Sequence, residues 1–103
     1  MQIPKLSQSS RSREFNKYSD IQRAEVVRAW LFDGRHHREI DKEILHLDPE
    51  YSHGYQSMGI LHYIGLRREF QGLFYGMTNE QAVVALKETN DPAYQKLIDI
   101  LSG

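Results

Sequence analysis

Signals for the start and end of helices follow one another so closely in this chain that none of its helices can be long. Two capping boxes mark helix starts. Two Asp-Pro pairs do so as well, because Asp is a favoured N-cap residue and Pro suits the first helical position. They are Ser19 with Gln22, Thr78 with Gln81, Asp48-Pro49 and Asp91-Pro92. Gly34, Gly65 and Gly76 are typical helix stops. The signals divide most of the chain into short helical segments.

Apolar residues between these signals recur with the period of a helix and never alternate as in a strand. We expect helices over 19–34, about 36–46, from Asp48-Pro49 to about Gly65, over 66–74, from Thr78 to Leu86, and from Asp91-Pro92 to Leu101. In the third of these, Tyr55, Met58 and Leu61 should face inward. The predicted fold is all-α, a compact bundle of five to six short helices.

The 103 residues allow one domain, and 40% apolar and 26% charged residues are typical of a globular chain. Residues 1–18 lack an apolar period and carry four basic side chains before Tyr18 against Glu14 alone. We therefore predict a flexible, basic, Ser-rich arm over 1–18 and a single helical domain over 19–103.

Charge and composition exclude several classes of protein. Residues 1–39 hold eight basic and five acidic groups, whereas residues 40–103 hold five and nine, so the near-neutral total hides a basic first part. Cysteine is absent, which excludes disulfides, thiol nucleophiles and Cys-ligated metals. No apolar run is long enough for a membrane span or a signal peptide, and we expect a cytoplasmic protein. No catalytic motif is present, so we predict no enzyme, no cofactor and no metal.

Residues 26–66 have the order of a helix-turn-helix module: helix, Gly34, helix, short connection, helix. This stretch resembles the helix-turn-helix of LuxR and sigma region-4 type regulators, whose Gly-x-Ser-x-x-Glu-Ile-Ala pattern lies over residues 34–41. The resemblance implies a helix-turn-helix-like unit at about 36–66 whose third helix enters the DNA major groove.

The chain departs from the family pattern in two places. Asp41 stands where the family has a small alanine facing the third helix, and the connection near Asp48-Pro49 is about one residue longer. A carboxylate at that position needs a partner. We expect Asp41 at a helix–helix junction, paired with a polar or basic group such as Arg38 or Arg67.

If the module binds DNA, the polar residues near the start of the third helix should contact bases, and nearby arginines should contact phosphates. The predicted base contacts are Ser52, His53, Gln56 and Ser57. The predicted phosphate contacts are Arg11, Arg13, Arg35, Arg38, Arg67 and Arg68. For any single arginine, a solvated surface charge is the alternative interpretation.

Two functions therefore compete. The first is sequence-specific or architectural binding of double-stranded DNA, in transcription regulation or genome defence, by a homodimer whose seam is the C-terminal helix if that helix is not part of the core. The second is a small protein–protein interaction module, an adaptor or inhibitor, that binds no nucleic acid. Exposure of His53, Gln56 and Ser57 on one face would favour DNA, and their burial would favour a protein partner.

Overall fold

The computed structural model describes residues 2–7, 18–48, 50 and 53–103. This part of the chain contains helices and turns and no strand, which confirms the all-α prediction. Its elements are α1 (Asp20–Leu31), α2 (His37–Glu43), α3 (Tyr55–Ile64), the 3₁₀ turn η1 (Arg68–Phe70), α4 (Asn79–Glu88), the 3₁₀ turn η2 (Pro92–Tyr94) and α5 (Gln95–Ser102). Within these ranges no helix is long and apolar enough to cross a membrane.

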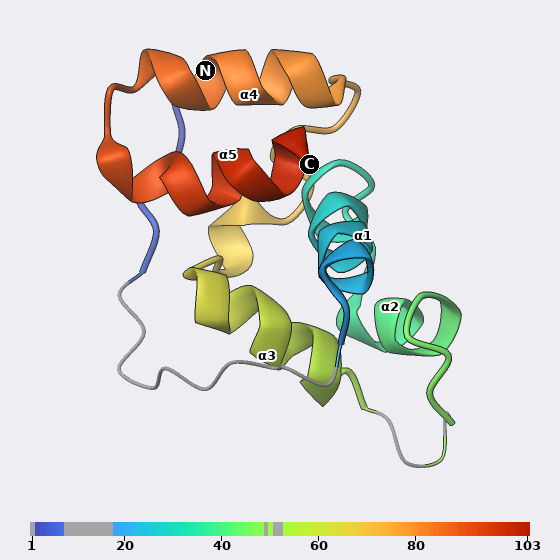
Figure 1. The fold of residues 1–103 in the computed structure, drawn as a ribbon. Helices are drawn as coiled ribbons and strands as arrows, with labels where there is room; N and C mark the ends of the chain where they lie inside the picture. The colour runs from blue at the N-terminus through green and yellow to red at the C-terminus, as the bar shows by residue number, and fades with distance from the viewer. Residues whose placement is uncertain (1, 8–17, 49, 51–52) are drawn as a thin grey trace.

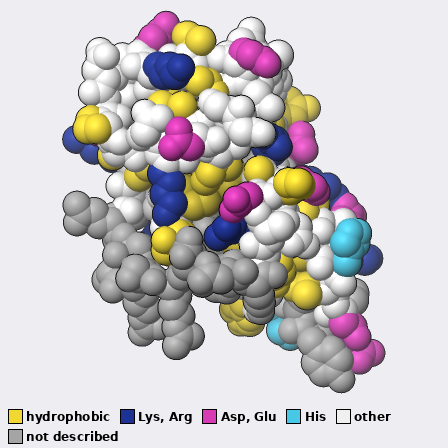
Figure 2. Space-filling model, viewed as in Figure 1, with side chains coloured by type: hydrophobic (Ala, Val, Ile, Leu, Met, Phe, Trp, Pro, Cys, Tyr) yellow, Lys and Arg dark blue, Asp and Glu magenta, His cyan; other side chains and the backbone are white. Residues whose placement is uncertain are grey.

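The helices form two pairs with α1 between them (Figure 1). Helix α2 packs on α3 at one end of the molecule, and α4 packs on α5 at the other. Helix α1 contacts α2, α3 and α5. A hollow remains where α1, α3 and α5 face one another, and hydrophobic side chains are visible in it (Figure 2).

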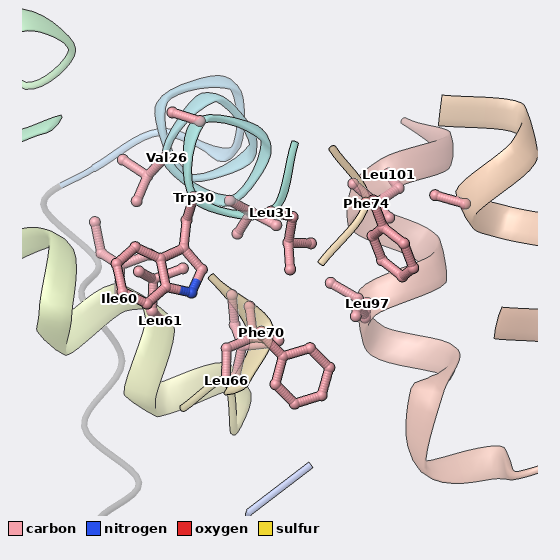
Figure 3. Packing of buried hydrophobic residues seen from close by; sticks show 14 of the residues in the cluster. Val26, Trp30, Leu31, Ile60, Leu61, Leu66, Phe70, Phe74, Leu97 and Leu101 are labelled. Carbon is pink, nitrogen blue, oxygen red and sulfur yellow. The ribbon is translucent and has the colours of Figure 1, made fainter. Parts of the chain in front are cut away.

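The core lies around α1 and joins the two pairs (Figure 3). Leu31, Phe70 and Phe74 are completely buried, and each such side chain contributes roughly 1.5–3 kcal/mol by leaving water. The apolar stripe of α5 belongs to this core, because Leu97 and Leu101 are buried within a single copy of the chain. That stripe therefore does not supply a dimer seam.

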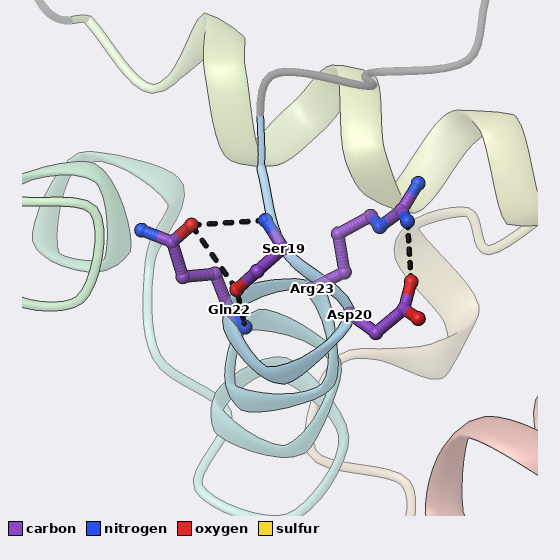
Figure 4. Close-up of polar contacts among 4 residues, drawn as sticks. All are labelled: Ser19, Asp20, Gln22 and Arg23. Carbon is purple, nitrogen blue, oxygen red and sulfur yellow. Dashed lines mark hydrogen bonds and ion pairs between the residues drawn. The ribbon is translucent and has the colours of Figure 1, made fainter.

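The predicted caps are confirmed at three helix starts. Ser19 and Gln22 form the reciprocal bonds of a capping box at the start of α1 (Figure 4), and Thr78 does the same with Gln81 at α4. At the start of η2 the Asp91 carboxylate accepts a hydrogen bond from the Ala93 amide at 2.9 Å. Each cap satisfies backbone donors that have no partner within the helix.

Helix α3 begins later than the sequence indicated. The prediction placed its start at Asp48-Pro49, but α3 starts at Tyr55 and its N-cap is Gly54. Gly54 has a φ of 89°, a left-handed conformation that ends any helix arriving from upstream. Asp48 forms a local turn instead, in which its side chain accepts from the Glu50 amide. Pro49 lies outside the described residues. The connection from α2 to α3 spans 44–54, far longer than the turn of a helix-turn-helix.

The helix predicted over 66–74 is also wrong. Only the η1 turn is helical there, and Gly72 has a φ of 68°, which interrupts any longer helix. The amide of Gly72 donates to the Trp30 carbonyl, and the amide of Phe74 donates to the Leu31 carbonyl. The segment therefore satisfies the last carbonyls of α1 in place of forming its own helical bonds.

Residues 2–7 pack against the domain, a contact that the predicted division into an arm over 1–18 and a domain over 19–103 did not include. The Ser7 amide donates to the Gly65 carbonyl at 2.8 Å, and the Tyr94 hydroxyl donates to the Pro4 carbonyl at 2.6 Å. Ile3 and Leu6 are partly buried against the core. A short extended segment with two apolar anchors has no helical period, and the sequence pattern could not reveal it. Residues 8–17 lie outside the described part.

Candidate functional site

Helix α3 presents a different face to solvent from the one predicted. Tyr55, expected to point inward, is 67% exposed, whereas Ser57 is completely buried. The buried face of α3 consists of Ser57, Ile60, Leu61 and Ile64. Ser57 therefore cannot contact a DNA base, and its assignment as a base contact is wrong. Leu61 is buried as expected, but Tyr55 was placed on the wrong side of the helix.

Asp41 and Ser57 meet at the contact between α2 and α3. The buried Asp41 carboxylate accepts from the Ser57 amide at 2.8 Å and from the Gln56 amide at 3.3 Å. Gly54 has no side chain with which to cap α3, so the carboxylate from α2 satisfies these amides. The prediction that Asp41 lies at a helix–helix junction is confirmed. Its partners here are backbone amides, and not Arg38 or Arg67 as expected.

The Ser57 hydroxyl completes this contact. Its oxygen lies 3.1 Å from the His37 carbonyl oxygen, 3.2 Å from the Gly54 carbonyl oxygen and 3.3 Å from His37 Nδ1. A hydroxyl has one hydrogen, so it donates to one carbonyl at a time and can accept from a protonated Nδ1. We call His37, Asp41, Gly54 and Ser57 the α2–α3 junction.

The His37 ring closes the junction on the side of α1. It stacks on the Trp30 indole with 4.3 Å between ring centroids. Burial lowers the pKa of His37, and the neighbouring His36 and His62 lower it further. The folded protein therefore favours neutral His37. With its polar groups paired and its imidazole neutral, the junction is a structural contact.

Gln56, the residue predicted to read a base directly, already has a partner. The Tyr18 hydroxyl donates to Gln56 Oε1 at 3.1 Å, and the Gln56 side chain is partly buried. Burial and the nearby Asp41 carboxylate raise the pKa of Tyr18, so its hydroxyl stays protonated as a donor. A bidentate contact to adenine would use this same oxygen, so Gln56 would have to share it with Tyr18 or release Tyr18.

The remaining predicted contacts do not gather on one face. Arg35 is paired with Glu39, at 3.8 Å, and with Glu43. Arg67 donates to the His62 carbonyl at 3.2 Å, at the C-terminal end of α3. His53, Arg38 and Arg68 are exposed. Ser52, Arg11 and Arg13 lie outside the described residues.

A separate apolar groove lies between α1, α3 and α5 and has a volume of about 680 Å³ (Figure 2). We call it the α1/α3/α5 groove. Apolar side chains from all three helices line it, with charged side chains among them. The lining residues are Asp20, Ile21, Arg23, Ala24, Arg28, Ile60, Tyr63, Ile64, Lys96, Asp99, Ile100 and Gly103.

The charges of the groove are only partly neutralised. Asp20 and Arg23 form an ion pair at 2.5 Å (Figure 4). The Asp99 carboxylate accepts from the Gln95 side chain at 2.8 Å. The Lys96 ammonium lies 3.8 Å from the centroid of the Tyr63 ring, a cation–π contact that leaves its charge without a carboxylate.

Two buried nitrogens have no hydrogen-bond partner within the described part of the chain: Arg28 Nε and Trp30 Nε1. Such atoms are rare in folded proteins, because each forfeits its hydration without compensation. Trp30 Nε1 lies within the core, and nothing in the structure explains it (Figure 3). Arg28 lines the groove and its side chain is only partly buried, so a bound molecule would reach this side chain.

The groove was not predicted from the sequence. Ile21 and Ala24 fit the inward apolar stripe of α1 by their helical spacing, but Ile21 is 72% exposed and Ala24 is only partly buried. A signal was present, because α1 and α3 carry apolar residues over more than one face. A helix with a single contact needs only one apolar stripe. The additional apolar surface predicts a second contact for these helices, but it does not identify what they contact.

Comparisons with protein families, with curated proteins and with solved structures find no match to this chain. Among the described residues, no three His, Asp or Glu side chains are grouped so that they could hold a metal ion. The site is therefore interpreted from its own geometry.

Proposed function

We propose that this chain is a small helical protein-interaction module, which binds a segment of a partner protein in the α1/α3/α5 groove. The observation that carries the proposal is an apolar groove of about 680 Å³ at the surface, with Ile21 72% exposed at its edge. Apolar surface gathered in a hollow and rimmed by charges is typical of interaction sites.

The geometry of α3 also favours a protein partner over DNA. DNA affinity depends on cations that neutralise phosphates. Helix α3 contains no Lys or Arg, Ser57 is buried, and Arg35 is paired with acids on α2. Of the seven described residues predicted to contact DNA, four are engaged within the protein, namely Gln56, Ser57, Arg35 and Arg67, whereas the groove is open.

The test is selection of binding peptides from a random phage-displayed library, about four helical turns in length. Selected peptides are then measured against two variants of the full chain, Ile21→Lys and Val84→Lys. Both positions are exposed β-branched residues on helices, and only Ile21 lines the groove. We expect Ile21→Lys to weaken binding at least about tenfold and Val84→Lys to leave it unchanged. Failure to select any peptide, or equal binding to both variants, would contradict the proposal.

Double-stranded DNA is a second candidate, and one observation favours it. At the start of α3, Tyr55 and His53 are exposed and their rings meet edge to face, and Arg38 on α2 is exposed as well. An aromatic side chain, an imidazole and a guanidinium are all groups that contact DNA.

This candidate is tested by the salt dependence of binding to a generic duplex. DNA binding predicts a steep fall in affinity with salt, and Arg38→Gln should reduce the slope of log K against log salt by about 1. The exposed Lys87 on α4 supplies the control variant, Lys87→Gln. Absence of binding at low salt, or equal effects of the two variants, would reject an α3 interface for DNA.

A further inference from the structure

Arg28 is the feature of the groove that says most about its occupant. It lies on α1 two turns after Ile21, and both side chains line the groove. Its Nε is buried and has no hydrogen-bond partner in the described part of the chain. Arginine presents a planar set of donors that matches a carboxylate, so an unsatisfied donor here indicates a missing acceptor.

The acids of the groove do not supply that acceptor. Asp20 is paired with Arg23, and Asp99, which accepts from the neutral Gln95 side chain, forms no ion pair with Arg28. Lys96 adds a second cation, whose described contact is the neutral Tyr63 ring. Of the three cations that line the groove, only Arg23 has a carboxylate partner among the described residues. With three cationic and two acidic side chains, the groove combines an apolar lining with an excess of positive charge.

We infer that the α1/α3/α5 groove binds an amphipathic helix of a partner protein, and that a carboxylate on this helix pairs with Arg28. The inference rests on the proposed function and specifies its partner. Apolar side chains of the helix would pack on Ile21, Tyr63 and Ile100, and a second acid would lie near Lys96. Helical walls on three sides suit a helix laid in the groove with anchors one turn apart.

The acid is the specific part of this inference. Apolar contacts give affinity to any sequence of suitable shape, but a bound helix also removes water from the cationic side chains of Arg28 and Lys96, which penalises a partner that brings no acceptor. The groove therefore selects for acidic amphipathic helices and against basic ones, whose charge would meet Arg28 and Lys96.

The experiment extends the peptide selection. Peptides retained by the wild-type chain and lost by Ile21→Lys are sequenced, and we expect them to be enriched in Glu or Asp within an apolar pattern of helical spacing. Replacing that acid in the peptide, Glu→Gln, should lower affinity about 10- to 100-fold on the wild-type chain. On Arg28→Gln the same peptide change should have little further effect, because the partner of the acid is gone.

Arg28→Lys and Lys87→Gln separate the pairing from general charge. Arg28→Lys keeps the charge but loses the forked geometry, so it should bind with intermediate affinity. Lys87→Gln removes an exposed cation from α4, outside the groove, and should bind as the wild type does. Circular dichroism melting of each variant establishes that the fold is kept.

The outcomes distinguish this inference from the proposed function. Two results would overturn the acidic partner and leave the proposed function standing. The first is a set of groove-dependent peptides that is not enriched in Glu or Asp. The second is a loss of affinity in Arg28→Gln and in the Glu→Gln peptide that simply adds when the two changes are combined. If no selected peptide depends on Ile21, both fail. Self-association of the chain that Ile21→Lys abolishes would assign the groove to a second copy and would overturn the inference.

Discussion

The α2–α3 junction and the α1/α3/α5 groove each contain a charged side chain with buried polar atoms, but only at the junction do these atoms have partners. At the junction the Asp41 carboxylate accepts two backbone amides, and Ser57 Oγ lies within hydrogen-bond distance of two carbonyl oxygens. In the groove Arg28 Nε is buried with no partner among the described residues. The first arrangement is complete within the chain, and the second is not.

This difference distinguishes a buried polar group that holds the fold together from one that is available to a binding partner. A buried polar group that is fully paired holds two helices in one relative position, and its removal leaves amides stranded. A buried donor without a partner forfeits its hydration, and at the groove, which Arg28 lines, another molecule can supply the acceptor.

The largest effect is expected for Asp41→Ala. It strands two amides at the start of α3 and should lower the free energy of unfolding by about 3 kcal/mol. Asp41→Asn keeps one acceptor and should cost roughly half as much. Urea unfolding followed by the fluorescence of Trp30, the one tryptophan, measures both. A loss below about 1 kcal/mol for Asp41→Ala would show that the junction does not hold the helices together.

Gly54→Ala should have the next largest effect. Gly54 has a φ of 89°, and an added Cβ would lie 2.6 Å from His37 Cβ. We expect a loss of about 2 kcal/mol, from left-handed strain and from displacement of α2. Gly76→Ala is the matched control, because Gly76 has a φ of 81° and no atom within 4 Å of an added Cβ. Equal losses for the two variants would mean that close packing of α2 on Gly54 contributes nothing.

Acid should weaken the junction through His37. Its pKa is lowered in the folded state, chiefly by burial, so below the unfolded pKa of 6.5 the unfolded chain binds more protons than the folded one. Stability is therefore complete above pH 6.5 and decreases as the pH falls from there toward the folded pKa. His62 has a pKa lowered by burial and by Arg67 and acts in the same direction.

His37→Phe tests this pH dependence, since it keeps an aromatic ring against Trp30 but removes the titration. Urea unfolding at pH 7.5 and pH 5 should show a smaller difference in stability for His37→Phe than for the wild type. The exposed His53 gives the control variant His53→Gln, which should retain the wild-type difference. An unchanged pH dependence in His37→Phe would show that burial of His37 has no energetic consequence.

The sequence predicted the local features of this fold and missed those that depend on distant contacts. Capping boxes and Asp-Pro starts act within one helical turn, so the starts of α1, α4 and η2 were correct. The start of α3 was misplaced because Gly54 adopts a left-handed conformation against α2, which is a tertiary contact. Asp41 was identified correctly as a junction residue, because a carboxylate at an inward position must have a partner.

The candidate site was harder to predict, because helical periodicity shows that a residue is apolar but not which neighbour covers it. Ile21 fits the α1 stripe in sequence and yet lines the groove. Arg28 has the sequence appearance of an ordinary surface cation. Only the packing of α1 against α3 and α5 reveals that its Nε is buried.

The free energy of unfolding of Arg28→Met distinguishes a guanidinium that serves a partner from one that stabilises the fold. Methionine preserves the apolar stem of the side chain and removes the unsatisfied donor. Urea unfolding should therefore give a stability within about 0.5 kcal/mol of the wild type, or above it. A loss of more than about 1 kcal/mol would contradict the account, because it would show that the Arg28 guanidinium stabilises the folded chain as Asp41 does.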